Sequence, residues 1–151
     1  MNRPQDLQRA ISVALEPFGE LAFAVLFGSG ASGRLRHDSD VDVAVYGASG
    51  RYLEIETNRK LAGEGKIQLA VERETGRNVD LLVLNRAPAT VCASAVTTGI
   101  PVVVRDDSVF SRYRLAVTSV AIGFLETERE WRAIRARSAS LSPQDRARGD
   151  S

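Results

Sequence analysis

Two strand-forming segments joined by a short, glycine-rich link constrain the fold of this chain more than any other feature. Residues 21–27 form a continuous apolar run, LAFAVLF, which is typical of a buried strand. In residues 41–45 three valines alternate with Asp42 and Ala44, the period-2 pattern of a second strand. The link begins GSGASG, and glycines in such numbers predict a tight turn directly after the first strand.

The remaining patterns predict an α/β domain. Apolar residues spaced by four indicate an amphipathic helix over residues 4–15, ended by Pro17 and Gly19. Residues 52–75 read as helical with a break, because Gly63 and Gly65 interrupt them. Further along we expect strands at 79–84 and 100–104, with a helix at 87–98 between them. Together these segments predict a mixed four-stranded sheet flanked by helices.

A long C-terminal helix is predicted from residue 107 to about residue 137. An alternating 3-4 spacing defines an apolar seam along it, made of Phe110, Tyr113, Val117, Val120, Phe124, Trp131 and Ile134. Such a helix would be about 45 Å long, so its end should project from the domain. Core packing explains most such seams, but Trp131 lies late enough to contact a partner. We expect one domain over residues 1–137 and a disordered tail over 138–151.

Composition excludes several classes of protein. The 151 residues are 44% hydrophobic and 26% charged, close to the averages for globular domains, and their net charge of +1 gives no strong nucleic-acid footprint. The N-terminus lacks a signal-peptide pattern, and no apolar run approaches the length of a membrane span, so we expect a cytoplasmic protein. The lone Cys92 excludes an internal disulfide and is expected to be a buried structural residue. Oligomeric state stays open.

The glycine-rich link matches a dinucleotide-binding motif only superficially. Gly28, Gly30 and Gly33 satisfy G-x-G-x-x-G after an apolar strand. However, residues 34–39 alone separate Gly33 from Asp40, whereas a parallel crossover with a helix needs about a dozen residues. The acidic residue expected about 20 positions further on is also missing. A dinucleotide site is therefore rejected.

A P-loop and an EF-hand are rejected as well. Arg34 and Leu35 stand where a P-loop requires Lys and Ser or Thr. A calcium loop starting at Asp38 would place Val43 at the obligatory glycine and Ser49 at the bidentate glutamate.

The arrangement that survives is Gly28-Ser29, a link of residues 30–39, and then Asp40-Val41-Asp42. Residues i and i+2 of a strand point the same way, about 6.5–7 Å apart, a spacing that suits a pair of Mg²⁺ or Mn²⁺ ions. Asp80, at the start of the third strand, could bind an ion or accept a proton from an attacking hydroxyl. Gly28 would let the backbone approach a phosphate, and Ser29 would add a hydroxyl and an N–H. Asp-x-Asp alone would also fit a solvent-facing edge strand.

Other polar residues near this block have weaker assignments. Arg34 and Arg36 could contact a triphosphate, but an exposed turn explains them equally well. We expect His37, the single histidine, to be a solvated loop residue, and Asp38 to shape the turn into the second strand. Lys66 could reach a phosphate, but nothing favours this role over simple exposure.

The block resembles the polymerase-β-type nucleotidyltransferase superfamily, specifically the minimal nucleotidyltransferases (MNT) marked by G-S-x10-D-x-D. The resemblance covers roughly residues 5–107 and is strongest over 28–42. It implies metal ligands and catalytic residues at Asp40, Asp42 and Asp80. It also implies nucleotide contacts from the preceding link, at Gly28, Ser29, Gly33 and Arg34.

The same resemblance implies a function and a partner. Small members of this superfamily often act as antitoxins of HEPN-domain toxins, transferring AMP from ATP to a toxin tyrosine in the presence of Mg²⁺. This implies a HEPN-type partner, in contact with the C-terminal helix near Trp131. Two alternatives stay open: an antitoxin that acts by binding alone, and a small-molecule enzyme of the antibiotic nucleotidyltransferase type. The latter usually carries an additional helical domain, for which this chain leaves little room.

Overall fold

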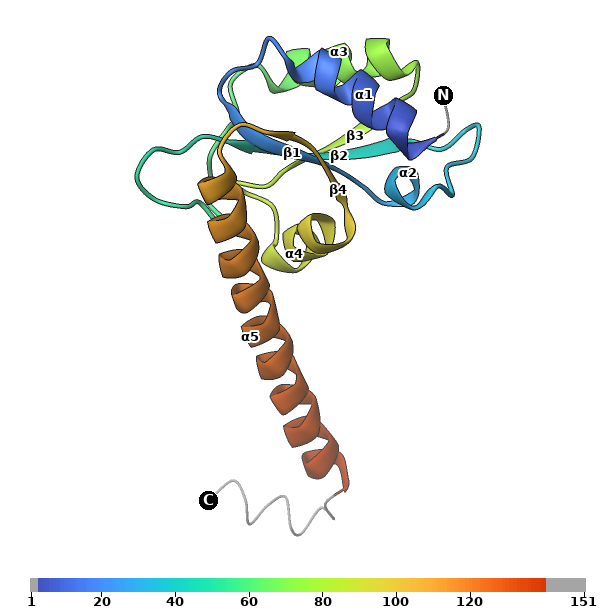
Figure 1. Ribbon diagram of the computed structural model, residues 1–151. Helices are drawn as coiled ribbons and strands as arrows, with labels where there is room; N and C mark the ends of the chain where they lie inside the picture. Colours follow the sequence, from blue (N-terminus) through green and yellow to red (C-terminus); the bar gives the residue numbers. More distant parts are fainter. Residues whose placement is uncertain (1–2, 141–151) are drawn as a thin grey trace.

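The computed structural model describes residues 3–140 as a small domain from which one long helix projects (Figure 1). The elements in chain order are α1 (Pro4–Leu15), β1 (Leu21–Phe27), α2 (Ser29–Ser32), β2 (Val41–Gly47), α3 (Glu64–Thr75), β3 (Val79–Val83), α4 (Ala89–Thr98), β4 (Ile100–Val104) and α5 (Asp107–Ser140).

The four strands form one mixed sheet in the order β3-β2-β1-β4. β1 is antiparallel to both β2 and β4, whereas β2 and β3 are parallel. The short link after β1 makes the antiparallel step, and the longer connection through α3 makes the parallel crossover. The predicted mixed four-stranded sheet is therefore confirmed.

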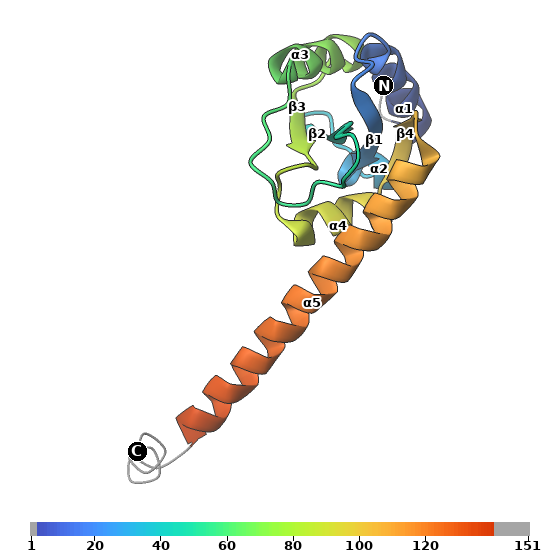
Figure 2. The same ribbon diagram turned by 90° about the vertical axis from the view of Figure 1, so that its left-hand side faces the viewer.

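Helices cover both faces of this sheet (Figures 1 and 2). α1 and α3 lie on one face, over a core that includes Leu7, Ile11, Val43 and Ile67. α4 and the first turns of α5 lie on the other face, over a second core that includes Phe23, Tyr46, Cys92 and Tyr113. Alternate residues of β2 feed the two cores, as the period-2 pattern of that strand requires.

The prediction for residues 52–75 is only half right. Residues 64–75 form α3, but residues 52–63 form an irregular loop. Its local pairings replace helical ones: Arg59 donates to Glu54 at 2.6 Å, and the Thr57 amide donates to the Asn85 carbonyl at 3.0 Å. Gly63, in the left-handed conformation at φ +73°, then immediately precedes α3 as its N-cap. Contacts with β-strand ends thus override a weak helical pattern.

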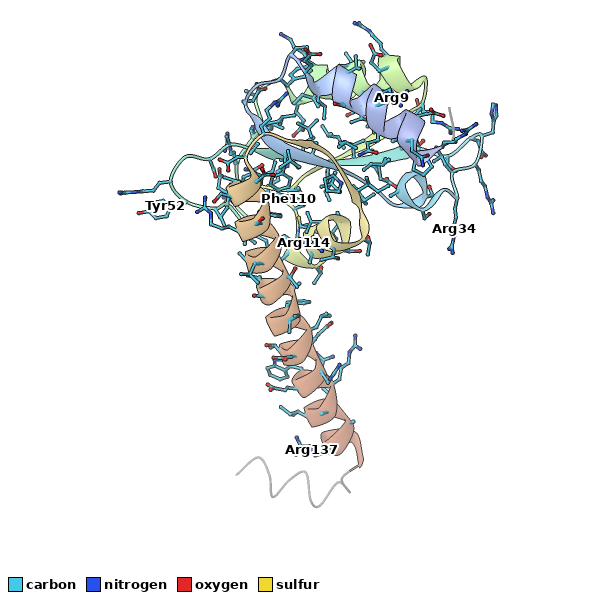
Figure 3. The ribbon with its side chains drawn as sticks, in the orientation of Figure 1. Arg9, Arg34, Tyr52, Phe110, Arg114 and Arg137 are labelled. Carbon is cyan, nitrogen blue, oxygen red and sulfur yellow. The ribbon has the colours of Figure 1, made fainter. Side chains whose placement is uncertain are left out.

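Helix α5 contains 34 residues, so it extends about 51 Å. It continues to Ser140, past the expected end at residue 137, and the rest of the expected tail, 141–151, lies outside the described residues. Its first turns are anchored by an aromatic cluster. The ring of Phe110 lies 4.9 Å from that of Phe23, and the ring of Tyr113 lies 4.9 Å from that of Tyr46. Figure 3 shows Phe110 at the point where α5 meets the domain.

The apolar seam of α5 divides into two parts. Tyr113 and Val117 are fully buried against the domain, and Ala121 is the last buried residue of the helix among those described. Beyond it the seam has no cover, and Phe124 and Trp131 are each 57% exposed. None of the helices within residues 3–140 is long and apolar enough to cross a membrane.

Candidate active site

Gly28 and Asp42 meet at the end of β1 and the start of β2. Phe27 lies opposite Asp42 in the antiparallel register, and Gly28 follows at once with φ +68° and ψ −149°. Residues that carry a side chain rarely adopt this backbone conformation. In addition, a Cβ on Gly28 would lie less than 3.0 Å from Oδ2 of Asp42. Glycine is therefore needed both for the turn and for the close approach of the carboxylate.

Asp80 joins Asp42 through the register of the parallel strands. Asp42 is paired with Asp80, and neighbouring strands lie about 4.8 Å apart. The following pair along the same face, Ala44 and Leu82, belongs to the core beneath α4 and α5. The two carboxylates therefore extend this face beyond the point where the core ends, and Asp80 is exposed.

Asp40 lies one residue before β2 rather than within it, and it is exposed to solvent, whereas Asp42 is half-buried. Burial of the carboxyl, followed by the negative charges of Asp80 and then Asp40, raises the pKa of Asp42. Asp80 and Asp40 thus lie close enough to Asp42 to act on it electrostatically. The structure brings the three predicted aspartates to one end of the sheet, around the most buried of the three.

The residues present fit a divalent cation. Carboxylate oxygens are the ligands that Mg²⁺ and Mn²⁺ prefer, and a cation would offset both the burial and the repulsion that raise the pKa of Asp42. The missing side chain of Gly28 leaves the space that Asp42 occupies. Within residues 3–140, no group of three or more His, Cys, Asp or Glu side chains is already closed into a metal-binding set. The fit therefore rests on the type and placement of the donors.

A comparison with protein families identifies the domain. Residues 10–108 match the family "Polymerase beta, Nucleotidyltransferase". The chain belongs to the polymerase-β nucleotidyltransferase family. The match covers all four strands of the sheet and every residue of the carboxylate site, and it ends where α5 begins. The sequence matches none of the curated proteins with which it was compared.

Solved structures of toxin–antitoxin complexes contain chains with the same nucleotidyltransferase fold. One is a complex with AMP-PNP, at 21% identity and a TM-score of 0.66, covering 86% of this chain and 98% of the other. Another contains a tri-AMPylated Shewanella oneidensis HEPN toxin with its MNT antitoxin, at 19% identity and a TM-score of 0.63, covering 89% and 98%. At these identities the similarity establishes the fold, including its projecting C-terminal helix.

The predicted nucleotide-binding residues are distributed around the link between β1 and β2. Ser29 is the first residue of α2, a single turn whose opening amides have no partner within the helix. Gly33 ends that turn in the left-handed conformation, at φ +76°. Arg34 is exposed, and its side chain extends away from the ribbon into solvent (Figure 3). A nucleotide contact from Arg34 stays a prediction.

The lone cysteine has a structural position in this nucleotidyltransferase. Cys92 is buried in α4 beside Tyr113, and burial raises the pKa of its thiol. The Tyr113 hydroxyl donates to the carbonyl of Leu84 at 2.9 Å, and burial raises its pKa as well. Both groups therefore belong to the core on the α4–α5 face. The expectation of a buried Cys92 is confirmed.

Sequence reasoning missed two residues that tie distant parts of the chain together, one beside the site and one at the far end of β2. Arg77, in the turn after α3, donates to three carbonyl oxygens of the loop before Asp40. Asn85, fully buried, exchanges two hydrogen bonds with the backbone of Gly47, at 2.9 and 3.0 Å. Both sets of bonds join residues about 40 positions apart, and no local pattern in the sequence signals them.

Proposed function

We propose that this nucleotidyltransferase transfers AMP from ATP to a hydroxyl group, and that the acceptor is a tyrosine of a HEPN-type toxin that the chain neutralises. The observation that carries the proposal is the grouping of Asp40, Asp42 and Asp80 beside the close approach of Gly28. Membership of the nucleotidyltransferase family supports the reaction class. The similarity of the fold to chains from toxin–antitoxin complexes, one with AMP-PNP and one with a tri-AMPylated toxin, supports the substrate and the acceptor.

Each residue has a role in this reaction. Asp40 and Asp42 would hold Mg²⁺ or Mn²⁺, which supplies charge neutralisation for the phosphates and the leaving group. Gly28 and Ser29 would carry the triphosphate on their backbone amides and the serine hydroxyl. Asp80 would orient the acceptor hydroxyl and take its proton; it could also serve as a metal ligand.

The proposed transfer is an in-line displacement at the α-phosphorus of ATP. The acceptor oxygen forms a bond to the α-phosphorus of ATP, and the bond from that phosphorus to the bridging oxygen breaks. Pyrophosphate leaves with the electron pair, and the proton of the hydroxyl passes to Asp80. Asp80 suits this last role because it is the exposed partner of the more buried Asp42.

The projecting half of α5 supports a protein partner over a small-molecule acceptor. Beyond Ala121 it carries large apolar side chains that nothing in the domain covers, each at least 45% exposed: Ile122, Phe124, Leu125, Trp131 and Ile134. An exposed set of this kind is typical of a surface for protein binding. We therefore propose that the toxin contacts this half of α5, near Trp131.

The decisive experiment is transfer of label from α-labelled ATP, with Mg²⁺, to a co-expressed HEPN-type toxin. The wild type is compared with Asp40→Ala/Asp42→Ala and with Asp38→Ala, an exposed carboxylate in the adjoining loop that serves as the matched control. Label should appear with the wild type and the control and disappear with the double variant. Tight binding of the toxin without any transfer by the wild type would instead favour an antitoxin that acts by binding alone.

A further inference from the structure

In the loop that leads into Asp40, Leu35 is buried in the core, but the bend that follows it has little packing to hold it in place. Arg36, His37 and Asp38 are exposed, as is Asp40 itself. Within the loop, the Ser39 amide donates to the Arg36 carbonyl at 3.1 Å, and the Arg36 amide donates to the Ser39 hydroxyl at 3.1 Å. These two bonds close a local turn, but they do not tie that turn to the sheet.

Arg77 supplies the missing connection. Its Nη1 lies 2.8 Å from the carbonyl oxygen of Arg36, 3.3 Å from that of His37 and 3.2 Å from that of Ser39. A guanidinium is permanently charged, and the two N–H groups of Nη1 serve these three oxygens, so one N–H is shared between two of them. One side chain from the α3–β3 turn thus holds the whole bend that precedes the first aspartate.

The next residue of the same turn holds the chain on the other side of Asp40. The carbonyl of Asn78 accepts a hydrogen bond from the amide of Val41 at 2.9 Å. Asp40 is therefore bracketed: Arg77 fixes the carbonyl of Ser39 before it, and Asn78 fixes the amide of Val41 after it. Because Asp80 lies only two residues beyond Asn78, this one segment determines where both exposed carboxylates stand relative to Asp42.

We infer that Arg77 is a positioning residue of the active site, which holds Asp40 in place to share a divalent cation with Asp42. This inference rests on the proposed function, because it assigns Arg77 a role toward the same cation. Arg77 touches neither substrate nor cation in this role; it acts through the backbone of residues 36–39. Catalytic groups displaced by about 1 Å lose on the order of 100-fold in rate, so the loss of a loop anchor should be measurable.

The test compares full-length wild type with Arg77→Ala, Arg77→Lys and Arg73→Ala. Arg73 is an exposed residue in the last turn of α3, one helical turn before Arg77, and its removal controls for lost positive charge. Mn²⁺ affinity in the presence of ATP is measured by electron paramagnetic resonance, and amide hydrogen exchange of residues 36–41 is measured by mass spectrometry. Asp42→Asn marks the affinity expected when the site itself is lost.

Arg77→Ala should weaken Mn²⁺ binding about tenfold or more and speed exchange in residues 36–41, while Arg73→Ala matches the wild type. Arg77→Lys should recover part of the affinity, because an ammonium still donates to carbonyl oxygens. If Arg77→Ala does not fold, Arg77→Lys carries the comparison, with an affinity between those of wild type and Asp42→Asn.

Two results would overturn the inference. One leaves the proposed function standing, and the other removes it as well. Faster exchange in residues 36–41 with unchanged Mn²⁺ affinity would mean that Asp40 does not depend on Arg77, and the proposed function would stand. Equal Mn²⁺ affinity in wild type and Asp42→Asn would remove the metal site itself, and the positioning role would fall with the proposed function.

Discussion

Gly28→Ala separates the chemistry of the site from the stability of the fold. At φ +68° and ψ −149°, an alanine costs on the order of 1–3 kcal/mol in backbone strain alone. Its Cβ would also lie within 3.0 Å of the Asp42 carboxylate, in space that the carboxylate now occupies. Asp42 must then turn away or the backbone must shift, and either change disrupts the arrangement of the three aspartates.

Gly63→Ala provides a matched control. Gly63 has a similarly positive φ of +73°, but a Cβ added there has nothing within 4 Å. This variant should lose about 1–2 kcal/mol from backbone strain without touching the site. In a domain of this size each kcal/mol lowers Tm by roughly 2–4 °C, so backbone strain should lower the Tm of both variants by several degrees, and the displaced Asp42 carboxylate should lower that of Gly28→Ala somewhat further.

The two variants should differ in activity. Displacing a catalytic group by about 1 Å costs on the order of 100-fold, so Gly28→Ala should lose AMP transfer by about that factor or more, while Gly63→Ala keeps the wild-type rate. Thermal melting and transfer of label from ATP, on the same preparations, provide both measurements. Equal rates for the two variants would refute the reasoning, because Asp42 would then tolerate the added Cβ.

Two further predictions concern stability. Asp42→Asn should raise Tm at pH 7 in EDTA. Because the pKa of Asp42 is raised in the folded state, ionised Asp42 destabilises the fold as pH rises above about 3.8, and this loss of stability is absent below that pH. Melting at pH 7 and at pH 3.5 checks this, and an equal gain at both would contradict the electrostatic cause. Val117→Ala should lose about 1–3 kcal/mol, whereas Phe124→Ala stays within about 0.5 kcal/mol, because only Val117 is buried. Denaturant unfolding measures both, and reduced co-purification of the toxin with Phe124→Ala alone would support docking on the projecting half of α5.

The parts of the fold that were predicted correctly are those in which burial leaves a regular trace along the sequence. α1 has its apolar residues four apart because one side of it packs on the sheet, and β1 is apolar throughout because both of its faces are covered. Residues 52–63 failed because their structure depends on partners far along the chain. Asn85, 28 residues from Thr57, helps to hold that loop in place, and no periodicity can reveal such a partner.

The site shows the same division. The grouping of Asp40 and Asp42 was predictable because a carboxylate within a strand otherwise rich in valine, with another just before it, calls for a compensating partner. Asp80 was predictable from the start of a third strand, although its pairing with Asp42 depends on the register of the sheet. Arg77 was not predictable. Its role depends on the three carbonyl oxygens that the fold brings to it, and not on a motif around it.

The electrostatics of the three carboxylates help to distinguish an enzyme from an antitoxin that acts only by binding its toxin. Burial, followed by repulsion from Asp80 and Asp40, raises the pKa of Asp42, so the group costs stability at neutral pH unless a cation compensates it. A chain that acts through a docking surface alone gains nothing from this cost, since the proposed docking residues, such as Phe124 and Trp131, lie on the projecting half of α5, away from the carboxylates. The arrangement therefore favours the proposed enzyme over an antitoxin that acts by binding alone. Chemistry and docking then lie on separate parts of the molecule, and variants of Asp42 and of Phe124 should impair one without the other.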